Sequence, residues 1–132
     1  MPQLKWDETE FIECLEILST VEDDSVSHVF EIKKDGLILQ LTVWQYESVV
    51  QLAVFREQVE VAVIEMALFV RGEVRYIKEL KSEFLEFCHC IPAASSFSYL
   101  NFPEDPFNQK EYPYDLNVWL FVKPHIRIHF AR

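Results

Sequence analysis

Apolar residues near the start of the chain recur at helical spacing. Positions i, i+3, i+4 and i+7 form one apolar stripe: Phe11, Cys14, Leu15 and Leu18. Asp7 precedes this stripe as an N-cap, Glu10 stands where a capping box needs an acid, and Trp6 is placed to pack on Phe11. The pattern predicts an amphipathic helix over residues 7–19, with Cys14 among its core-facing side chains.

Further along, the hydrophobic period changes to two, which is typical of half-buried strands. The predicted strands are residues 29–33, 37–44, 49–55, 59–70 and 74–78. Asp35-Gly36 lies between the first two runs as a hairpin turn, and Arg71-Gly72 is predicted to form another turn. Residues 80–91 fit either a helix or a strand, and the preceding strands favour a strand. Residues 28–91 are therefore predicted to form a β-meander.

Residues 92–115 differ in composition from the rest of the chain. They hold four of the six prolines, which keeps the segment out of central strands. They also hold six aromatic residues: Phe97, Tyr99, Phe102, Phe107, Tyr112 and Tyr114. Disordered linkers are poor in aromatic residues, so we expect an ordered loop packed over the body. Two short terminal strands are predicted over residues 116–130, separated by Lys123-Pro124.

The strands at 37–44 and 59–70 are apolar on both faces, although one short helix covers only part of one face. The second face must therefore be buried by curling of the sheet, by the 92–115 loop or by another chain. We expect an α+β fold in a single domain, residues 1–132. Its N-terminal helix precedes a mostly antiparallel meander of seven or eight strands, curled into a sandwich or partial barrel.

Composition limits where the chain acts and how its cysteines are used. Half of its 132 residues are apolar, as in globular domains, but no apolar run is long enough to span a membrane. The N-terminus lacks the basic and then apolar pattern of a signal peptide, so we expect a cytoplasmic protein with no membrane association. Three cysteines without scaffold spacing are predicted to be free thiols.

Negative charge is concentrated at the start of the chain. Residues 1–31 hold nine acids and one base, while the whole chain has a net charge of −10. Plain solvation of a surface is the simplest interpretation of such a run. An acidic element also repels nucleic acid and attracts basic proteins, so nucleic-acid binding is not expected. If a partner exists, it is predicted to carry a basic surface.

Cys88, His89 and Cys90 are three consecutive residues of types that bind metal. A structural zinc site needs four ligands, usually as two pairs from separate elements, and this chain has no second pair. Neighbouring Glu86 disfavours a reactive thiolate. Two small buried thiols beside a histidine with its own partner are the favoured interpretation. A composite metal site that adds a distant histidine is the weaker alternative.

Other catalytic machinery is not recognisable in the sequence. The only two glycines, Gly36 and Gly72, cannot build a phosphate-cradling loop, and no nucleophile elbow occurs. Glu65 interrupts an apolar run, and an outward position on its strand is favoured over a buried, perturbed one. We therefore expect a protein that is not an enzyme and that holds no cofactor.

The function hypothesis is a binding protein of bacterial type that acts through protein–protein contacts, as an acidic inhibitor or immunity protein would. Glu13 and Glu16 on the helix would steer a basic partner, and the aromatic residues of the 92–115 loop would anchor it. One alternative is a curved sheet that binds a small apolar ligand, with walls formed by Trp44, Met66 and Trp119. Another alternative is a structural homodimer that buries its spare sheet face.

Overall fold

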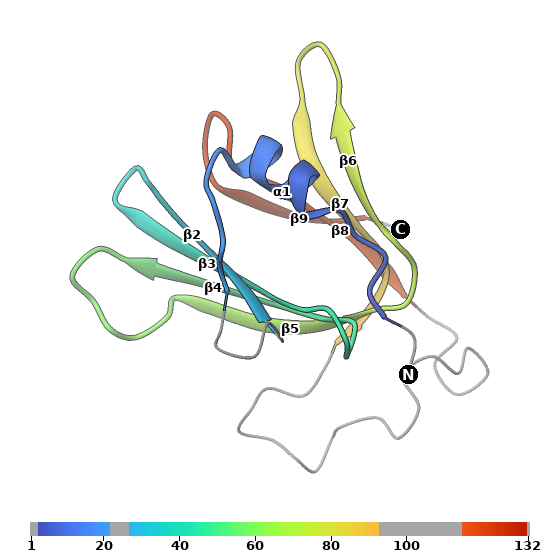
Figure 1. Ribbon diagram of the computed structural model, residues 1–132. Helices are drawn as coiled ribbons and strands as arrows, with labels where there is room; N and C mark the ends of the chain where they lie inside the picture. The colour runs from blue at the N-terminus through green and yellow to red at the C-terminus, as the bar shows by residue number, and fades with distance from the viewer. Residues whose placement is uncertain (1–2, 22–26, 93–114, 132) are drawn as a thin grey trace.

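One short helix and one antiparallel sheet make up the described part of the chain. The computed structural model describes residues 3–21, 27–92 and 115–131 (Figure 1). The elements are α1 (Glu8–Leu15), β1 (Thr20–Val21), β2 (Ser27–Lys34), β3 (Leu37–Trp44), β4 (Val49–Arg56), β5 (Ile64–Val70), β6 (Val74–Lys78), β7 (Glu83–Pro92), β8 (Leu116–Phe121) and β9 (Arg127–Ala131). The predicted α+β class with a curled, mostly antiparallel sheet is confirmed.

The helix begins as predicted but ends early. Asp7 caps it by accepting a hydrogen bond from the Thr9 backbone N–H at 2.9 Å, and Trp6 packs edge-on against Phe11 at 4.9 Å. Glu16 then adopts a left-handed conformation with a φ of 59°, and its N–H bonds to the Ile12 carbonyl. This C-cap stops the helix four residues before the predicted end at residue 19. Leu18 is consequently 74% exposed and does not belong to the buried stripe.

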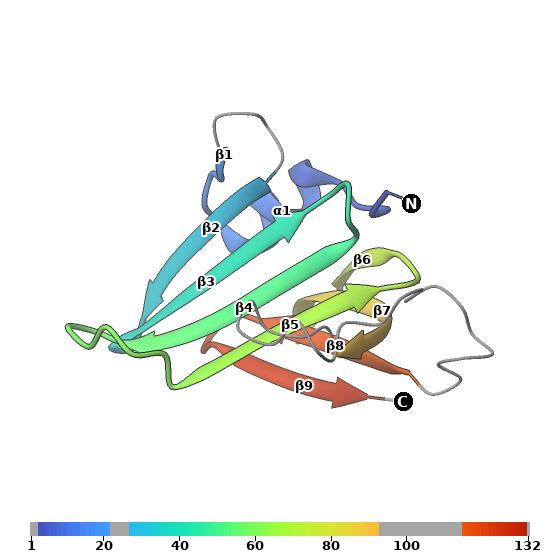
Figure 2. The same cartoon turned by 90° about the horizontal axis from the view of Figure 1, so that it is seen from below.

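The sheet curls around α1 without closing into a barrel. The strand order is β1-β2-β3-β4-β5-β7-β8-β9, with β6 paired to β7 beside this path. The Phe11 ring lies 5.5 Å from the Phe30 ring of β2 and 6.1 Å from the Phe87 ring of β7, so one helical side chain bridges both arms of the curve. Figure 1 shows α1 on the inner side of the curved sheet, and Figure 2 shows the two arms from below.

Gly72 lies in a bend and not in the predicted hairpin turn. β5 and β6 run in the same direction along one edge of β7, so the chain does not reverse between them. The Gly72 N–H donates to the Cys88 carbonyl at 3.0 Å, and a Cβ at this position would lie 2.9 Å from that oxygen. Glycine is needed at residue 72 because the two backbones approach closely at the bend.

Residues 80–91, which fitted either secondary structure, belong largely to a strand. β7 pairs with β6 through its first half and with β5 through its last three residues. The real hairpin turn between β6 and β7 lies at Glu79–Ser82, where Glu79 and Ser82 exchange backbone hydrogen bonds. The preference for a strand was correct, whereas the turn at Glu79–Ser82 was not among the predicted turns.

Buried side chains form two clusters on opposite faces of the sheet. The main cluster fills the inner face between α1 and the strands, with Phe11, Phe30, Leu41 and Phe87 among its members. A small second cluster on the outer face contains Val49, Phe69 and Ile91, with Trp44 packed against it. Side chains alternate between these faces along β3 and β4, as the period of two predicted.

The predicted strand at 59–70 starts five residues late, at Ile64. The intervening residues leave the sheet and form an exposed loop between β4 and β5. We call this loop, together with the last residue of β4 and the first two residues of β5, the 56–65 tip. Its exposed apolar side chains are Val59 (46%), Val61 (75%), Val63 (58%) and Ile64 (47%). The alternating pattern predicted a strand that buries its valines. These valines are exposed because the loop that holds them lies beyond the paired parts of β4 and β5.

The 92–115 loop falls almost wholly outside the described residues. Pro92 ends β7 and Asp115 precedes β8, so only the two ends of this segment are placed. Both terminal strands are found, with bounds within two residues of the predicted ones. In the described part of the chain, no helix is long and apolar enough to cross a membrane.

Candidate functional site

The Cys88-His89-Cys90 stretch forms a β-bulge in β7. Phe87 pairs with Val118 and Cys90 pairs with Leu116, so two residues of β7 oppose the single residue Asn117. His89 has a left-handed φ of 56°, which turns its backbone N–H out of the ladder. The Asn117 side-chain oxygen accepts from that N–H at 3.0 Å. The bulge is thus completed by a side chain in place of a backbone carbonyl.

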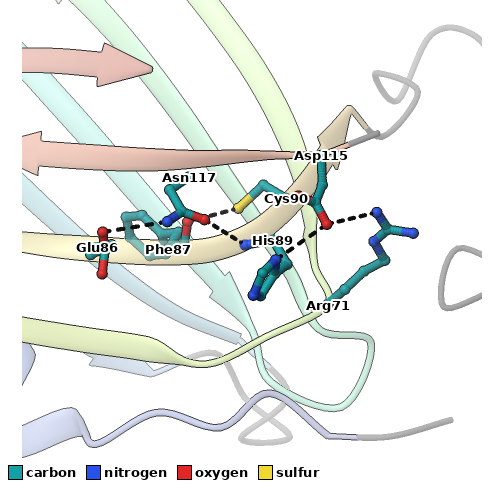
Figure 3. A network of polar contacts seen from close by, with 7 residues as sticks. All are labelled: Arg71, Glu86, Phe87, His89, Cys90, Asp115 and Asn117. Carbon is teal, nitrogen blue, oxygen red and sulfur yellow. Dashed lines mark hydrogen bonds and ion pairs between the residues drawn. The ribbon is translucent and has the colours of Figure 1, made fainter. Parts of the chain in front are cut away.

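Charged residues converge beside the bulge (Figure 3). The Asp115 carboxylate lies 3.0 Å from Arg71 Nη2 and 3.2 Å from His89 Nδ1 through the same oxygen. The Arg71 side chain is only 3% exposed, while the His89 ring faces solvent. The arrangement joins the β5–β6 bend to the start of β8. The Arg71–Asp115 ion pair therefore has a structural role, because it holds the β5–β6 bend against the start of β8.

Glu86, two positions before the bulge pair Cys88 and His89, is a buried carboxylate with several partners. Its Oε2 accepts from Trp119 Nε1 at 2.8 Å and from Asn117 Nδ2 at 3.5 Å. Arg75 Nη1 lies 3.4 Å from its other oxygen. These donors offset the desolvation of the carboxylate, which explains how an acid is accommodated next to the core.

The thiols of the bulge are suited to a structural role. Cys88 and Cys90 are buried and free, and so is Cys14. Burial, together with the negative charge of Glu86, raises the pKa of the Cys88 thiol to about 11. Burial also raises the pKa of Cys90, whose thiol donates to the Phe87 carbonyl at 3.2 Å. Such thiols stay protonated at neutral pH and are weak nucleophiles.

Metal ligation finds no support around the bulge. Within residues 3–21, 27–92 and 115–131, no three His, Cys, Asp or Glu side chains are grouped so that they could hold a metal ion. Cys88 and Cys90 are buried on β7, while the His89 ring is exposed and engaged by Asp115. The three residues that are adjacent in sequence therefore do not converge on one point.

The two acids proposed to steer a partner lie on α1 and at its C-cap, with lysines near them. Glu13 and Glu16 are both exposed. Glu16 lies 3.0 Å from Lys123 Nζ, and Glu13 lies 3.9 Å from Lys78 Nζ. These lysines come from β6 and from the segment after β8, so the ion pairs also attach α1 to the sheet. The field of the helix is weaker than the sequence alone predicts.

Below these exposed ion pairs, Glu83 of β7 connects Lys123, the partner of Glu16, to Tyr76 of β6. Its carboxylate accepts from Lys123 Nζ at 2.6 Å and from the Tyr76 hydroxyl. Burial acts to raise the pKa of Glu83, but the hydrogen bonds from Lys123 and Tyr76 outweigh it and lower that pKa below its ordinary value. The pKa of Lys123 is raised, since its bonds to Glu83 and Glu16 outweigh desolvation. The cluster is an ionised network at neutral pH.

The three predicted ligand-wall residues are not brought together. Met66 packs against the main core, and Trp44 packs against the second cluster on the opposite face. Trp119 lies on β8 between Phe84 and His129. Two hollows in the described part of the chain measure about 160 and about 140 Å³, below the ~300 Å³ at which small-molecule pockets begin.

The predicted aromatic anchors belong to the 92–115 loop. Phe97, Tyr99, Phe102, Phe107, Tyr112 and Tyr114 all lie outside the described residues. The 56–65 tip, in contrast, is a surface that the sequence analysis missed. A usable signal was present, since Glu57, Glu60 and Glu65 are interleaved with the valines and are hard to bury in a sheet.

Comparison with known proteins shows one structural likeness. No model of a known protein family matches the sequence, and no curated protein matches it. The fold is similar to a chain of a contact-dependent growth inhibition toxin–immunity protein complex from Klebsiella pneumoniae 342. The match has a TM-score of 0.66 and 15% sequence identity, and covers 98% of this chain and 96% of that chain. At this level of identity the two chains share a fold from end to end.

Proposed function

We propose that this protein is an immunity-type protein that binds and neutralises a toxin protein with a basic surface in the bacterial cytoplasm. The observation that carries the proposal is the end-to-end likeness to a chain of a toxin–immunity protein complex. The match covers nearly all of both chains, so the whole fold is shared and not only one motif. By analogy of fold, it supports a role for this chain in binding another protein.

Two properties of the chain support the same conclusion. The most reactive-looking residues, His89, Asp115 and the neighbouring cysteines, are engaged in ion pairs or protonated by burial. The net charge of −10 favours a basic partner and accelerates its encounter. In this proposal Glu13 and Glu16 contribute to steering, and the aromatic residues at 97–114 contribute anchoring contacts.

Growth rescue tests the proposal directly. Bacteria express toxin domains from the source organism of this chain, each with and without co-expression of the chain. We expect one toxin to be neutralised, and native mass spectrometry of the purified pair to show a stoichiometric complex. If none of these toxins is neutralised and none forms a complex, the proposal is wrong.

Steering has its own test on the same complex. Glu13→Lys with Glu16→Lys should slow association and flatten its dependence on salt. Glu47→Lys with Glu79→Lys is the matched control, because it makes the same change in net charge at two exposed positions outside the helix. Equal effects of the two double variants would show that overall charge acts, and not the helix.

A further inference from the structure

The 56–65 tip is held in one conformation by its backbone. The Glu57 N–H donates to the Gly36 carbonyl at 2.9 Å, which ties the tip to the β2–β3 turn. The Val63 N–H donates to the Val54 carbonyl at 2.7 Å and continues the β4–β5 ladder. Gln58 has a left-handed φ of 65°, an unfavourable conformation for a residue with a Cβ. The tip is therefore a defined loop whose valines stay outside the core.

The side chains of the tip form an unusual exposed surface. Val59, Val61, Val63 and Ile64 are all exposed within six residues, and they have no core to pack against. Single exposed aliphatic residues are common on soluble proteins, whereas clustered ones mark interaction sites. In Figures 1 and 2 the β4–β5 connection projects from one end of the sheet, away from both marked chain ends. The location leaves the surface accessible to a large partner.

A hollow of about 160 Å³ lies next to the tip on the outer face of the sheet. Its lining residues are Gln40, Thr42, Gln51, Leu52, Ala53, Phe55, Glu65, Met66 and Ala67. Glu65 is its only charged member and is exposed. Phe55 offers a ring, and Gln40 keeps an amide oxygen as an acceptor because its nitrogen is directed to Glu31 at 3.5 Å. A carboxylate, an acceptor and an aromatic ring suit a cationic side chain.

The charge of the tip indicates which kind of partner is complementary to this surface. The tip has Glu57, Glu60 and Glu65 against a single base, Arg56. No ion pair engages these three carboxylates within the described residues. A second copy of the chain would bring the same excess of negative charge, which disfavours tip-to-tip association. A partner with an apolar patch rimmed by lysine or arginine is complementary.

We propose that the 56–65 tip and the adjoining hollow form a docking surface for a basic partner protein. The valines pack on an apolar patch of the partner, and one arginine or lysine of the partner enters the hollow against Glu65. This inference rests on the proposed function in one respect, which is that the partner is identified as a toxin. The docking chemistry itself is testable without any toxin.

The first test titrates the hollow with a single side chain. N-acetylarginine amide is added to isotopically labelled protein, and amide shifts are followed by NMR. N-acetylcitrulline amide, nearly the same shape without the charge, is the matched probe. We expect saturable shifts at residues 51–55 and 64–67 with half-saturation on the order of 10 mM, and at least fivefold weaker binding of citrulline. Glu65→Gln should remove this preference. No shifts at these residues, or equal binding of both probes, would overturn the assignment of the hollow.

The second test measures toxin affinity once growth rescue has identified the toxin. Val61→Ser with Val63→Ser should weaken binding at least about tenfold, as expected for central interface contacts. Leu18→Ser with Leu80→Ser is the control, because both leucines are exposed and lie outside the tip. Unchanged affinity of the tip variant in a toxin complex would refute docking at the tip and leave the proposed function intact. If no toxin is neutralised, the proposed function is wrong. The arginine titration still tests whether the hollow binds a cationic side chain.

Discussion

The 56–65 tip and the bulged half of β7 distribute polarity in opposite ways. At the tip, aliphatic side chains are exposed, with Val61 75% accessible to solvent. At the bulge, charged side chains are buried, with Arg71 only 3% and Glu86 8% accessible. Both regions depart from the usual rule that apolar residues are inside and charges outside. The departures have different physical explanations.

Buried charge at the bulge is accounted for within the chain. Arg71 has Asp115, and Glu86 has Trp119, Asn117 and Arg75 as partners, so desolvation is offset by hydrogen bonds and ion pairs. Exposed apolar surface at the tip has no such compensation in the described residues. The comparison assigns the bulge to stability and is consistent with the proposed role of the tip in binding. Substitutions should separate these two roles.

Loss of the Asp115 carboxylate should have the largest effect on stability. Asp115→Ala removes the Asp115 ion pair from the buried Arg71 guanidinium, and we expect the free energy of unfolding to fall by about 3 kcal/mol. The value lies at the low end for buried pairs because Asp115 is 26% exposed. Urea denaturation measures the change. The double variant Arg71→Met with Asp115→Leu should recover part of the loss, and equal instability of both variants would contradict this account.

Gly72→Ala should be the next most damaging change. The added Cβ would lie 2.9 Å from the Cys88 carbonyl oxygen, so β6 and β7 must separate at the bend. We expect a loss of about 2 kcal/mol in the free energy of unfolding. Gly36→Ala is a useful comparison, since its Cβ meets nothing within 4 Å and only its φ of 78° is unfavourable. A larger loss at Gly36 than at Gly72 would show that the close approach matters less than backbone conformation.

Much of the fold was predictable because local patterns and burial agree along most strands. Asp35-Gly36 was recognised as a turn from its dipeptide, and β3 and β4 were recognised from their period of two. The Gly72 bend was mistaken for a turn because a glycine between two apolar runs is typical of both. Only the pairing of β5 and β6 with the same neighbour, β7, distinguishes them. That pairing is non-local and leaves no local signal.

The polar sites were less predictable for a related reason. Residues 88–90 are adjacent in sequence, but the His89 ring is exposed whereas both thiols are buried. The residue that engages its ring, Asp115, is 26 positions away. Glu13 was correctly assigned to the helix and Glu16 caps it, whereas their lysine partners come from β6 and from the segment after β8. Sequence identified the groups, and tertiary structure determined what each one does.

The ionised cluster under α1 should make stability depend on pH at both extremes. The folded pKa of Glu83 is lowered, so its contribution is present above its ordinary value of 4.5 and is lost as pH falls through the folded pKa. The folded pKa of Lys123 is raised, so its contribution is present below 10.5 and is lost as pH rises through the folded pKa. Glu83→Gln should cost about 1 kcal/mol at pH 7, with less cost near pH 3. Thermal unfolding from pH 3 to pH 8 would test this, and a pH-independent difference would argue against it.

Polar substitutions at the tip should have the smallest effect on folding. Val61→Ser with Val63→Ser replaces aliphatic groups that are already exposed, so we expect the free energy of unfolding to change by less than about 0.5 kcal/mol. Val50→Ser on β4 is the buried counterpart, because Val50 is fully inaccessible, and it should lose more than about 2 kcal/mol. Chemical denaturation of the three proteins compares them directly. A tip variant that loses as much stability as Val50→Ser would mean that the valines are buried in the folded chain. It would also remove the reason to assign the tip to a partner. Unchanged stability would leave the exposed valines without a role in folding, which is the condition that the docking surface requires.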